Sequence, residues 1–170
     1  MYPAGNVIRV TPTLSTDAYA DNDILFLTTE IPGAVSDRGG VSNIVDISVH
    51  SKTVVELDKD IIFMEEQVDY GSINAYSSAT DAVIRSSKFL GVVSFDGSQH
   101  VSGVGSGTDT TSSALFTYSN KLNAEPSGKT SFLLKASGNS TSVYFTAILR
   151  DQTPTYADGD LEFIFHIKYL

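Results

Sequence analysis

Two short acidic segments contain the residue types that could bind a hard cation. Residues 21–23 read Asp-Asn-Asp and residues 158–160 read Asp-Gly-Asp, and calcium binds to clusters of oxygen ligands. Neither segment continues into the D-x-[DN]-x-[DN]-G loop with a distal glutamate that completes a calcium site. Asp and Asn also cap tight turns with their own side chains, and Gly accepts a positive φ. The spacing therefore predicts two turns, and we expect no bound metal.

The other groups that could do acid–base or metal chemistry are scattered. His50, His100 and His166 have no partner at the spacing of a metal signature, and His166 is expected on the outer face of the last strand. Glu65 and Glu66 are adjacent on a predicted strand, so their side chains point to opposite faces and cannot form a catalytic dyad. We interpret all five as ordinary surface residues.

Recognisable catalytic motifs are absent from the sequence. It contains no G-x-S-x-G, no P-loop and no G-x-G-x-x-G that opens a helix, and the glycine-rich residues 103–107 precede no helical pattern. The chain has no cysteine, which excludes disulfides, thiolate metal sites and a cysteine nucleophile. We therefore expect no enzyme and no cofactor, although a triad assembled in space leaves no local signature.

One short sequence pattern occurs twice, and its residues are those of a structural turn. Thr-Pro-Thr at 11–13 precedes Tyr-Ala-Asp-Asn-Asp at 19–23, and Thr-Pro-Thr at 153–155 precedes Tyr-Ala-Asp-Gly-Asp at 156–160. Each copy is an extended X-Pro segment and an acidic turn, followed by a run of apolar and aromatic residues. This pattern predicts a turn that leads into a β-strand.

Alternation of apolar and polar residues identifies the strands. In residues 161–170 every odd position is apolar or aromatic, and the even positions include Glu162, His166 and Lys168, which is the pattern of a strand with one buried face. Residues 143–150 repeat it. Further predicted strands cover residues 6–10, 24–29, 41–50, 52–57, 61–66, 89–95, 115–118 and 130–136.

About ten short strands with turn residues between them favour a sandwich or barrel. Residues 80–87 are the one predicted helix, with Thr80 as a capping residue and Asp81 in the first turn. The expected fold is all-β: an antiparallel two-sheet sandwich, jelly-roll-like, with at most one short helix, formed by residues 1–170 as a single domain.

Charge and composition limit the partners. The formal net charge is −9, from 20 acidic and 11 basic residues, so we expect no binding to nucleic acid or to an anionic membrane. The first residues lack the features of a signal peptide, and no apolar run reaches the ~20 residues of a membrane helix. The expectation is a soluble protein that is made in the cytoplasm.

Three loops are candidates for contacts with other proteins: residues 33–40, 69–76 and 96–113. The third is either a mobile surface loop or a contact loop that orders against a neighbouring subunit. Tyrosine and apolar side chains are the usual anchors of interfaces. The candidate interface residues are Tyr2, Pro3, Val35, Arg38, Tyr70, Tyr76, His100, Val101 and Val104.

The ordered set of segments resembles a known family. It comprises VTPTLSTDAYADNDILF, RGGVSNIVDISV, ELDKDIIFMEE, the short helix into KFLGVVSF, and AILRDQTPTYADGDLEFIFHI. These segments resemble small virion proteins of tailed bacteriophages, many from marine and cyanobacterial hosts, which are described as capsid-associated, decoration or cement proteins. The Gly/Ser/Thr-rich residues 97–113 depart from the pattern.

The resemblance implies a viral structural protein without catalytic residues. It would bind the major capsid protein on the outer surface of the phage capsid and stabilise the virion. It would act as a symmetric homo-oligomer, with a trimer favoured and a dimer as the alternative. The second hypothesis is a glycan-binding β-sandwich of a phage fibre or tail tip. Tyr and Asp residues in the loops favour it, and the absence of tryptophan, a common platform for sugar rings, opposes it.

Overall fold

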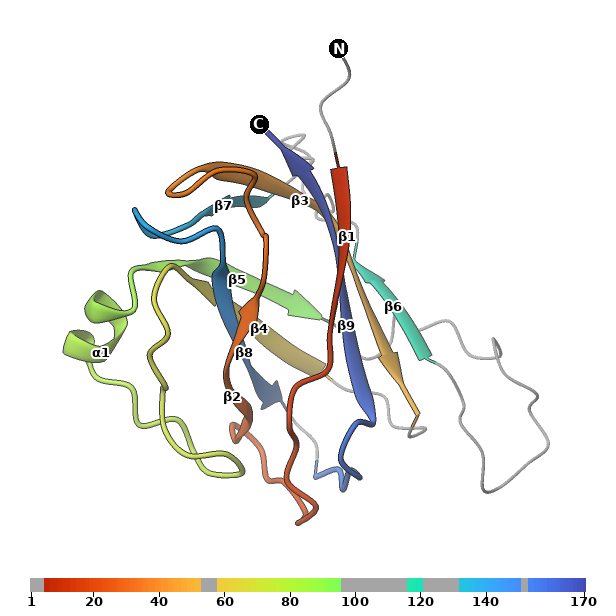
Figure 1. Cartoon of the computed structure of the whole chain (residues 1–170). Coiled ribbons are helices and arrows are strands. Elements are labelled where there is room, and N and C mark those ends of the chain that lie inside the picture. The colour runs from red at the N-terminus through yellow and green to blue at the C-terminus, as the bar shows by residue number, and fades with distance from the viewer. Residues whose placement is uncertain (1–4, 53–57, 96–115, 121–131, 151–152) are drawn as a thin grey trace, which may run out of the picture.

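A computed structural model of the chain describes residues 5–52, 58–95, 116–120, 132–150 and 153–170. In these residues it contains nine strands and one helix (Figure 1). The elements are β1 (Gly5–Val10), β2 (Ile24–Ile31), β3 (Val41–Ser51), β4 (Asp58–Met64), α1 (Asp81–Ser86), β5 (Phe89–Phe95), β6 (Phe116–Asn120), β7 (Phe132–Lys135), β8 (Val143–Arg150) and β9 (Leu161–Tyr169).

Two antiparallel sheets pack face to face. The first sheet has the order β1-β9-β3-β6, with β7 pairing the same edge of β3 as β6, and the second has the order β2-β8-β4-β5. With β7 as an added strand, this connectivity is that of a jelly roll. The prediction of an all-β two-sheet sandwich with one short helix is confirmed. Of the predicted strand 52–57, Lys52 lies outside any strand and the rest lies outside the described residues.

The alternation in the sequence places the core between the sheets. The odd-numbered residues of β9 are buried from Leu161 to Ile167, and the same holds for β8 from Val143 to Leu149. The outer position of His166 is confirmed, since it is partly exposed opposite Val7. Phenylalanine rings from β2, β4, β8 and β9 fill the centre of this core.

Both copies of the repeated phrase form the same turn. In each copy the backbone N–H of the alanine donates a hydrogen bond to the carboxylate of the last aspartate, over 2.7 Å from Ala20 to Asp23 and 2.8 Å from Ala157 to Asp160. These bonds occupy one oxygen of each aspartate in a turn, which confirms the turn prediction. Asn22 in the first turn has a φ of 67°, and Gly159 in the second turn has a φ of 76°. Asn and Gly adopt such positive φ values most easily.

The two turns are the corners at which the chain changes sheets. One lies between β1 and β2, and the other lies between β8 and β9. Tyr19 and Tyr156 meet edge to face with ring centroids 5.8 Å apart, and the N–H of Tyr19 donates to the carbonyl of Pro154. Because β1 pairs β9 and β2 pairs β8, the two repeated segments lie side by side and are related by an approximate two-fold axis.

Residues 65–88 cover the outer face of the second sheet (Figure 1). Tyr70 and Val83 pack there against Ile62, Met64 and Ile148. The predicted helix is confirmed as α1, with the side chain of its N-cap residue, Thr80, accepting a hydrogen bond from the N–H of Val83. A helix of six residues is too short to be stable alone, so this packing holds it in place.

Gly91 in β5 gives a first testable prediction. A Cβ at this position would lie 2.7 and 2.8 Å from two ring carbons of Phe132, and its φ of 154° is one that other residues rarely adopt. We expect Gly91→Val to lower the free energy of unfolding by about 3 kcal/mol through overpacking and backbone strain. Urea unfolding followed by circular dichroism measures the change.

The matched control is Gly138→Ala. A Cβ at Gly138 meets no atom within 4 Å, so this variant should stay within about 0.5 kcal/mol of the wild type. Equal unfolding midpoints for the Gly91→Val and Gly138→Ala variants would show that Phe132 does not pack tightly against Gly91.

Candidate functional site

Two of the residues predicted for the interface are wrong, because they are buried. Val35 is 2% exposed, since it packs in the core together with Ala34 and its N–H bonds to the carbonyl of Thr141. Tyr70 is 5% exposed and packs on the second sheet, and its hydroxyl lies 2.8 Å from Oγ of Ser87. Both side chains stabilise the fold and neither reaches the surface.

The other predicted interface residues divide into two groups. Arg38 and Tyr76 are exposed, as the interface prediction requires. Tyr76 is held at its position by a backbone bridge to Asp23. The remaining members, Tyr2, Pro3, His100, Val101 and Val104, lie outside the described residues.

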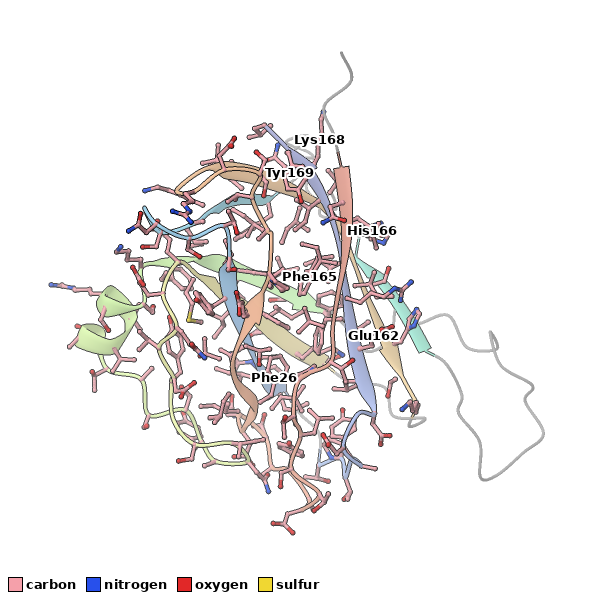
Figure 2. The ribbon with its side chains drawn as sticks, viewed as in Figure 1. Phe26, Glu162, Phe165, His166, Lys168 and Tyr169 are labelled. Carbon is pink, nitrogen blue, oxygen red and sulfur yellow. The ribbon has the colours of Figure 1, made fainter. Side chains whose placement is uncertain are left out.

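The outer side of β1, β9 and β3 forms a continuous surface, which we call the open face. Strand register sets its cross-strand rows, such as Val7–His166–Asp46 and Arg9–Ile164–Ser48. Figure 2 shows Glu162 and His166 on the opposite side of β9 from Phe26 and Phe165. The members of the open face are Val7, Arg9, Asn43, Val45, Asp46, Ser48, His50, Glu162, Ile164, His166 and Lys168, of which Ser48 and Ile164 are buried.

The open face combines exposed apolar side chains with both signs of charge. Val7 is 51% exposed and Val45 is 42% exposed, on either side of His166. These residues line a shallow hollow of about 320 Å³. Val45 is directed outward beside Asp46 by a bulge in β3, an irregularity that the alternating pattern of residues 41–50 does not reveal.

A second hollow lies at the other end of the open face. It has a volume of about 310 Å³ and is lined by Thr11, His50, Lys52, Gly159, Asp160 and Glu162. Oε2 of Glu162 accepts a hydrogen bond of 2.9 Å from Arg9 and lies 3.5 Å from Nδ1 of His50. The hollow therefore presents donors and acceptors together. Sequence reasoning missed it, because its residues come from three separate strand ends.

Glu65 and Glu66 follow β4, where Glu65 is buried and Glu66 is partly exposed. The strand predicted for 61–66 ends at Met64, because the N–H groups of Glu65 and Glu66 bond to the carbonyls of Lys88 and Ser87. Nζ of Lys88 lies 2.8 Å from Glu66. Hydrogen bonds from Lys88 and Ser137 lower the pKa of the Glu66 carboxyl. Glu66 is part of a surface ion network, as expected of a solvated rim. The expectation is wrong for Glu65, which is buried with its carboxylate 3.6 Å from Nζ of Lys135 and 4.0 Å from Nζ of Lys88.

Lys59 is a buried charge that sequence reasoning missed. It is almost fully buried, and its Nζ lies 5.7 Å from the ring centroid of Phe95. Burial lowers the pKa of Lys59 to about 7, and the nearby Asp58 carboxylate partly opposes this shift. The available signal was its spacing, since Lys59, Ile61 and Phe63 share one face of β4.

In the part of the chain that the structure describes, no three His, Asp or Glu side chains come close enough to hold a metal ion. Within the same residues, no helix has the length and apolar character needed to span a membrane. Comparison of the chain with protein-family models gives no match, and comparison with curated proteins also gives none. The functional argument therefore depends on the geometry of the molecule.

Proposed function

We propose that this protein is a structural component of a virion that binds the outer surface of a tailed-phage capsid and stabilises it, without catalysis. The observation that carries the proposal is the difference between the two outer faces of the sandwich. Residues 65–88 bury Ile62, Met64 and Ile148 on the outer side of the second sheet, where Val92 remains 44% exposed, whereas the open face exposes Val7 and Val45 around His166. An exposed apolar surface rimmed by polar groups is typical of a protein-binding site.

The fold and the charge distribution support this function. Jelly rolls form many viral capsid and lectin domains, although a fold alone implies no function. The open face carries Arg9 and Lys168 together with Asp46 and Glu162, and Arg9 forms an ion pair with Glu162, so its charged groups balance in a chain of net charge −9. Docking through this face keeps the excess negative charge away from the contact and limits its electrostatic cost.

The partner in this proposal is the major capsid protein, and the location is the capsid surface of the virion. The binding energy comes from burying the valines of the open face against a capsomer, with the surrounding polar groups excluding water. The protein acts as a homo-oligomer, so several open faces engage one shell and raise its overall avidity.

Capsid binding provides the test. Purified protein is mixed with capsids of the phage that encodes this chain, before and after expansion, and bound copies are measured by sedimentation. We expect saturable binding at a fixed number of copies per shell, and a higher temperature of capsid disruption. Val45→Glu should weaken binding at least tenfold, because it places a charge in the centre of the contact.

Leu27→Glu is the matched control for this experiment. Leu27 is an exposed strand residue of the second sheet with the same exposure as Val45, so its substitution should leave capsid binding unchanged. A wild-type protein that binds neither form of the capsid contradicts the proposed function. Equal weakening by Val45→Glu and Leu27→Glu contradicts the assignment of the open face.

A glycan-binding module of a fibre or tail tip is the second candidate. The hollow lined by Thr11, His50, Lys52 and Glu162 favours it, since its donors and acceptors suit the hydroxyl groups of a sugar. Failure to bind capsids, together with binding to a glycan array that is lost in Lys52→Ala, would support this candidate over the first.

A further inference from the structure

Lys52 is one of the residues that line the second hollow of the open face, which has a volume of about 310 Å³. It follows the last residue of β3, and its backbone N–H donates a 2.9 Å hydrogen bond to the carbonyl of Asp160. This bond joins the end of β3 to the acidic turn that precedes β9. The backbone of Lys52 is therefore fixed at the hollow, while its side chain is exposed.

The ammonium group of Lys52 lies next to the acidic turn. A Cβ added at Gly159 would lie 3.9 Å from Nζ of Lys52, so this end of the lysine side chain lies close to the backbone of the turn. Because Lys52 and Gly159 both line the hollow, the positive charge is available to a group that enters it.

The acidic groups of the hollow already have partners in the same chain. Oε2 of Glu162 accepts a hydrogen bond of 2.9 Å from Arg9 and lies 3.5 Å from Nδ1 of His50. Oδ2 of Asp160 accepts a hydrogen bond of 2.8 Å from the N–H of Ala157. These contacts hold both carboxylates to their own surroundings, and neither forms an ion pair with Lys52.

Lys52 itself forms no ion pair with any other residue that the structure describes. The chain has 20 acidic and 11 basic residues, so an exposed cation without an acidic partner stands out on this surface. Thr11 is exposed in the same hollow and adds a hydroxyl group. The hollow therefore offers an available positive charge together with a neutral hydrogen-bond donor.

We propose that this hollow is a pocket for a carboxylate, supplied by an Asp or Glu side chain of the capsid protein, with the ammonium group of Lys52 as its partner. The inference rests on the proposed function and deepens it, because it names the chemistry that the open face binds at this end. Charge-assisted hydrogen bonds are stronger than neutral ones. The exposed valines at the other end supply apolar burial, and the charge pair fixes the orientation of the partner.

A carboxylate fits the hollow better than a neutral sugar. Sugar hydroxyl groups donate and accept hydrogen bonds, so a sugar site needs available acceptors as well as donors. The carboxylates of Asp160 and Glu162 are engaged within the chain. An ionised carboxylate only accepts hydrogen bonds, which matches the ammonium group of Lys52 and the hydroxyl group of Thr11.

Substitutions at Lys52 test the charge in the capsid-binding experiment. Lys52→Gln keeps a hydrogen-bond donor without the charge and should weaken binding about fivefold, and Lys52→Glu should weaken it further. Lys52→Arg keeps the charge and should bind as the wild type does. The matched control is Arg85→Gln, which changes the net charge by the same amount at an exposed residue of α1. It should leave binding unchanged.

Titration with acetate tests the hollow without the capsid. Sodium acetate replaces sodium chloride at constant ionic strength, and proton–nitrogen NMR spectra of the full chain record the backbone amides. We expect saturable shifts at Lys52 and Gly159 in the wild type and in Arg85→Gln, and none in Lys52→Gln. Glucose, a neutral sugar, should cause no shift at these amides.

The outcomes separate this inference from the proposed function. If capsids bind and Lys52→Gln behaves like Arg85→Gln, the inference is wrong and the proposed function stands. If the wild type binds no capsid, the proposed function is contradicted and the acetate titration decides. Acetate shifts that Lys52→Gln abolishes would then support the carboxylate pocket, and their absence would overturn it. Shifts with glucose and none with acetate would overturn it in favour of the glycan-binding candidate.

Discussion

Replacement of Phe145 by alanine is expected to lower the free energy of unfolding by about 4 kcal/mol, as found for large core truncations. Phe145 is fully buried at the centre of β8. Its ring centroid lies 5.0, 5.1, 5.2 and 6.4 Å from those of Phe165, Phe26, Phe163 and Phe63. Truncation removes contacts with both sheets at once, because Phe163 and Phe165 belong to the first sheet and the other two rings belong to the second.

Chemical denaturation at pH 7 measures this effect. Phe145→Leu keeps most of the volume and should recover at least half of the loss, whereas Tyr76→Ala removes an exposed aromatic ring and should change stability by less than 1 kcal/mol. A loss below about 1 kcal/mol in Phe145→Ala would show that the cluster collapses around the cavity, or that the two sheets do not share one core.

Lys59→Met is expected to stabilise the protein at pH 6 and to remove part of its pH dependence. The pKa of Lys59 is about 7 in the folded state, against 10.5 as its ordinary value. Between these values the unfolded chain binds one more proton at Lys59 than the folded protein, so the free energy of unfolding rises with pH. The rise from Lys59 alone is about 2 kcal/mol between pH 7 and pH 9.

At pH 6 Lys59 is protonated in both states, and the folded protein then carries a buried ammonium group. Methionine fills a similar volume without that charge, so the Lys59→Met variant should gain several kcal/mol at pH 6, and this gain should be about 3 kcal/mol smaller at pH 9. Burial also raises the pKa of Tyr19 and of Tyr144. The unfolding series therefore stops at pH 9, below the range in which tyrosines titrate.

Lys168→Met provides the comparison for this series. Lys168 is exposed on the open face, so its removal should leave the slope of stability against pH unchanged. Parallel curves for the wild type and for Lys59→Met between pH 7 and pH 9 would contradict the low pKa. They would show that the ammonium group of Lys59 keeps its ordinary pKa in the folded protein.

Most strands were predictable from the order of residues, because a strand with one buried face has apolar and polar residues at alternate positions. Residues 89–95 and 143–150 match β5 and β8 without a shift. Short helices are harder to predict, yet the capping residue Thr80 marked the start of α1 correctly. The prediction for 61–66 extended too far, since a backbone contact with residues 87–88 ends β4 and local pattern carries no trace of that contact.

The candidate interface was much less predictable. Loop composition suggested Val35 and Tyr70, but both are buried. Exposure depends on what the rest of the chain places over a residue, and a loop rich in turn residues can fold inward as readily as outward. Val7 and Val45 were not singled out, because they belong to strands that looked like core. Only the pairing of β1, β9 and β3 shows that they share one exposed surface.

The sequence by itself determined the local properties of this protein: alternating strands, the two identical acidic turns, a short capped helix, and a strongly acidic chain without cysteine. These follow from side-chain period, turn chemistry and composition, each of which acts over a few residues. The tertiary structure alone decided which strands pair, which residues of each outer face are covered, and that Lys59 is buried. Those properties arise from contacts between segments far apart in the chain, and no local pattern encodes them.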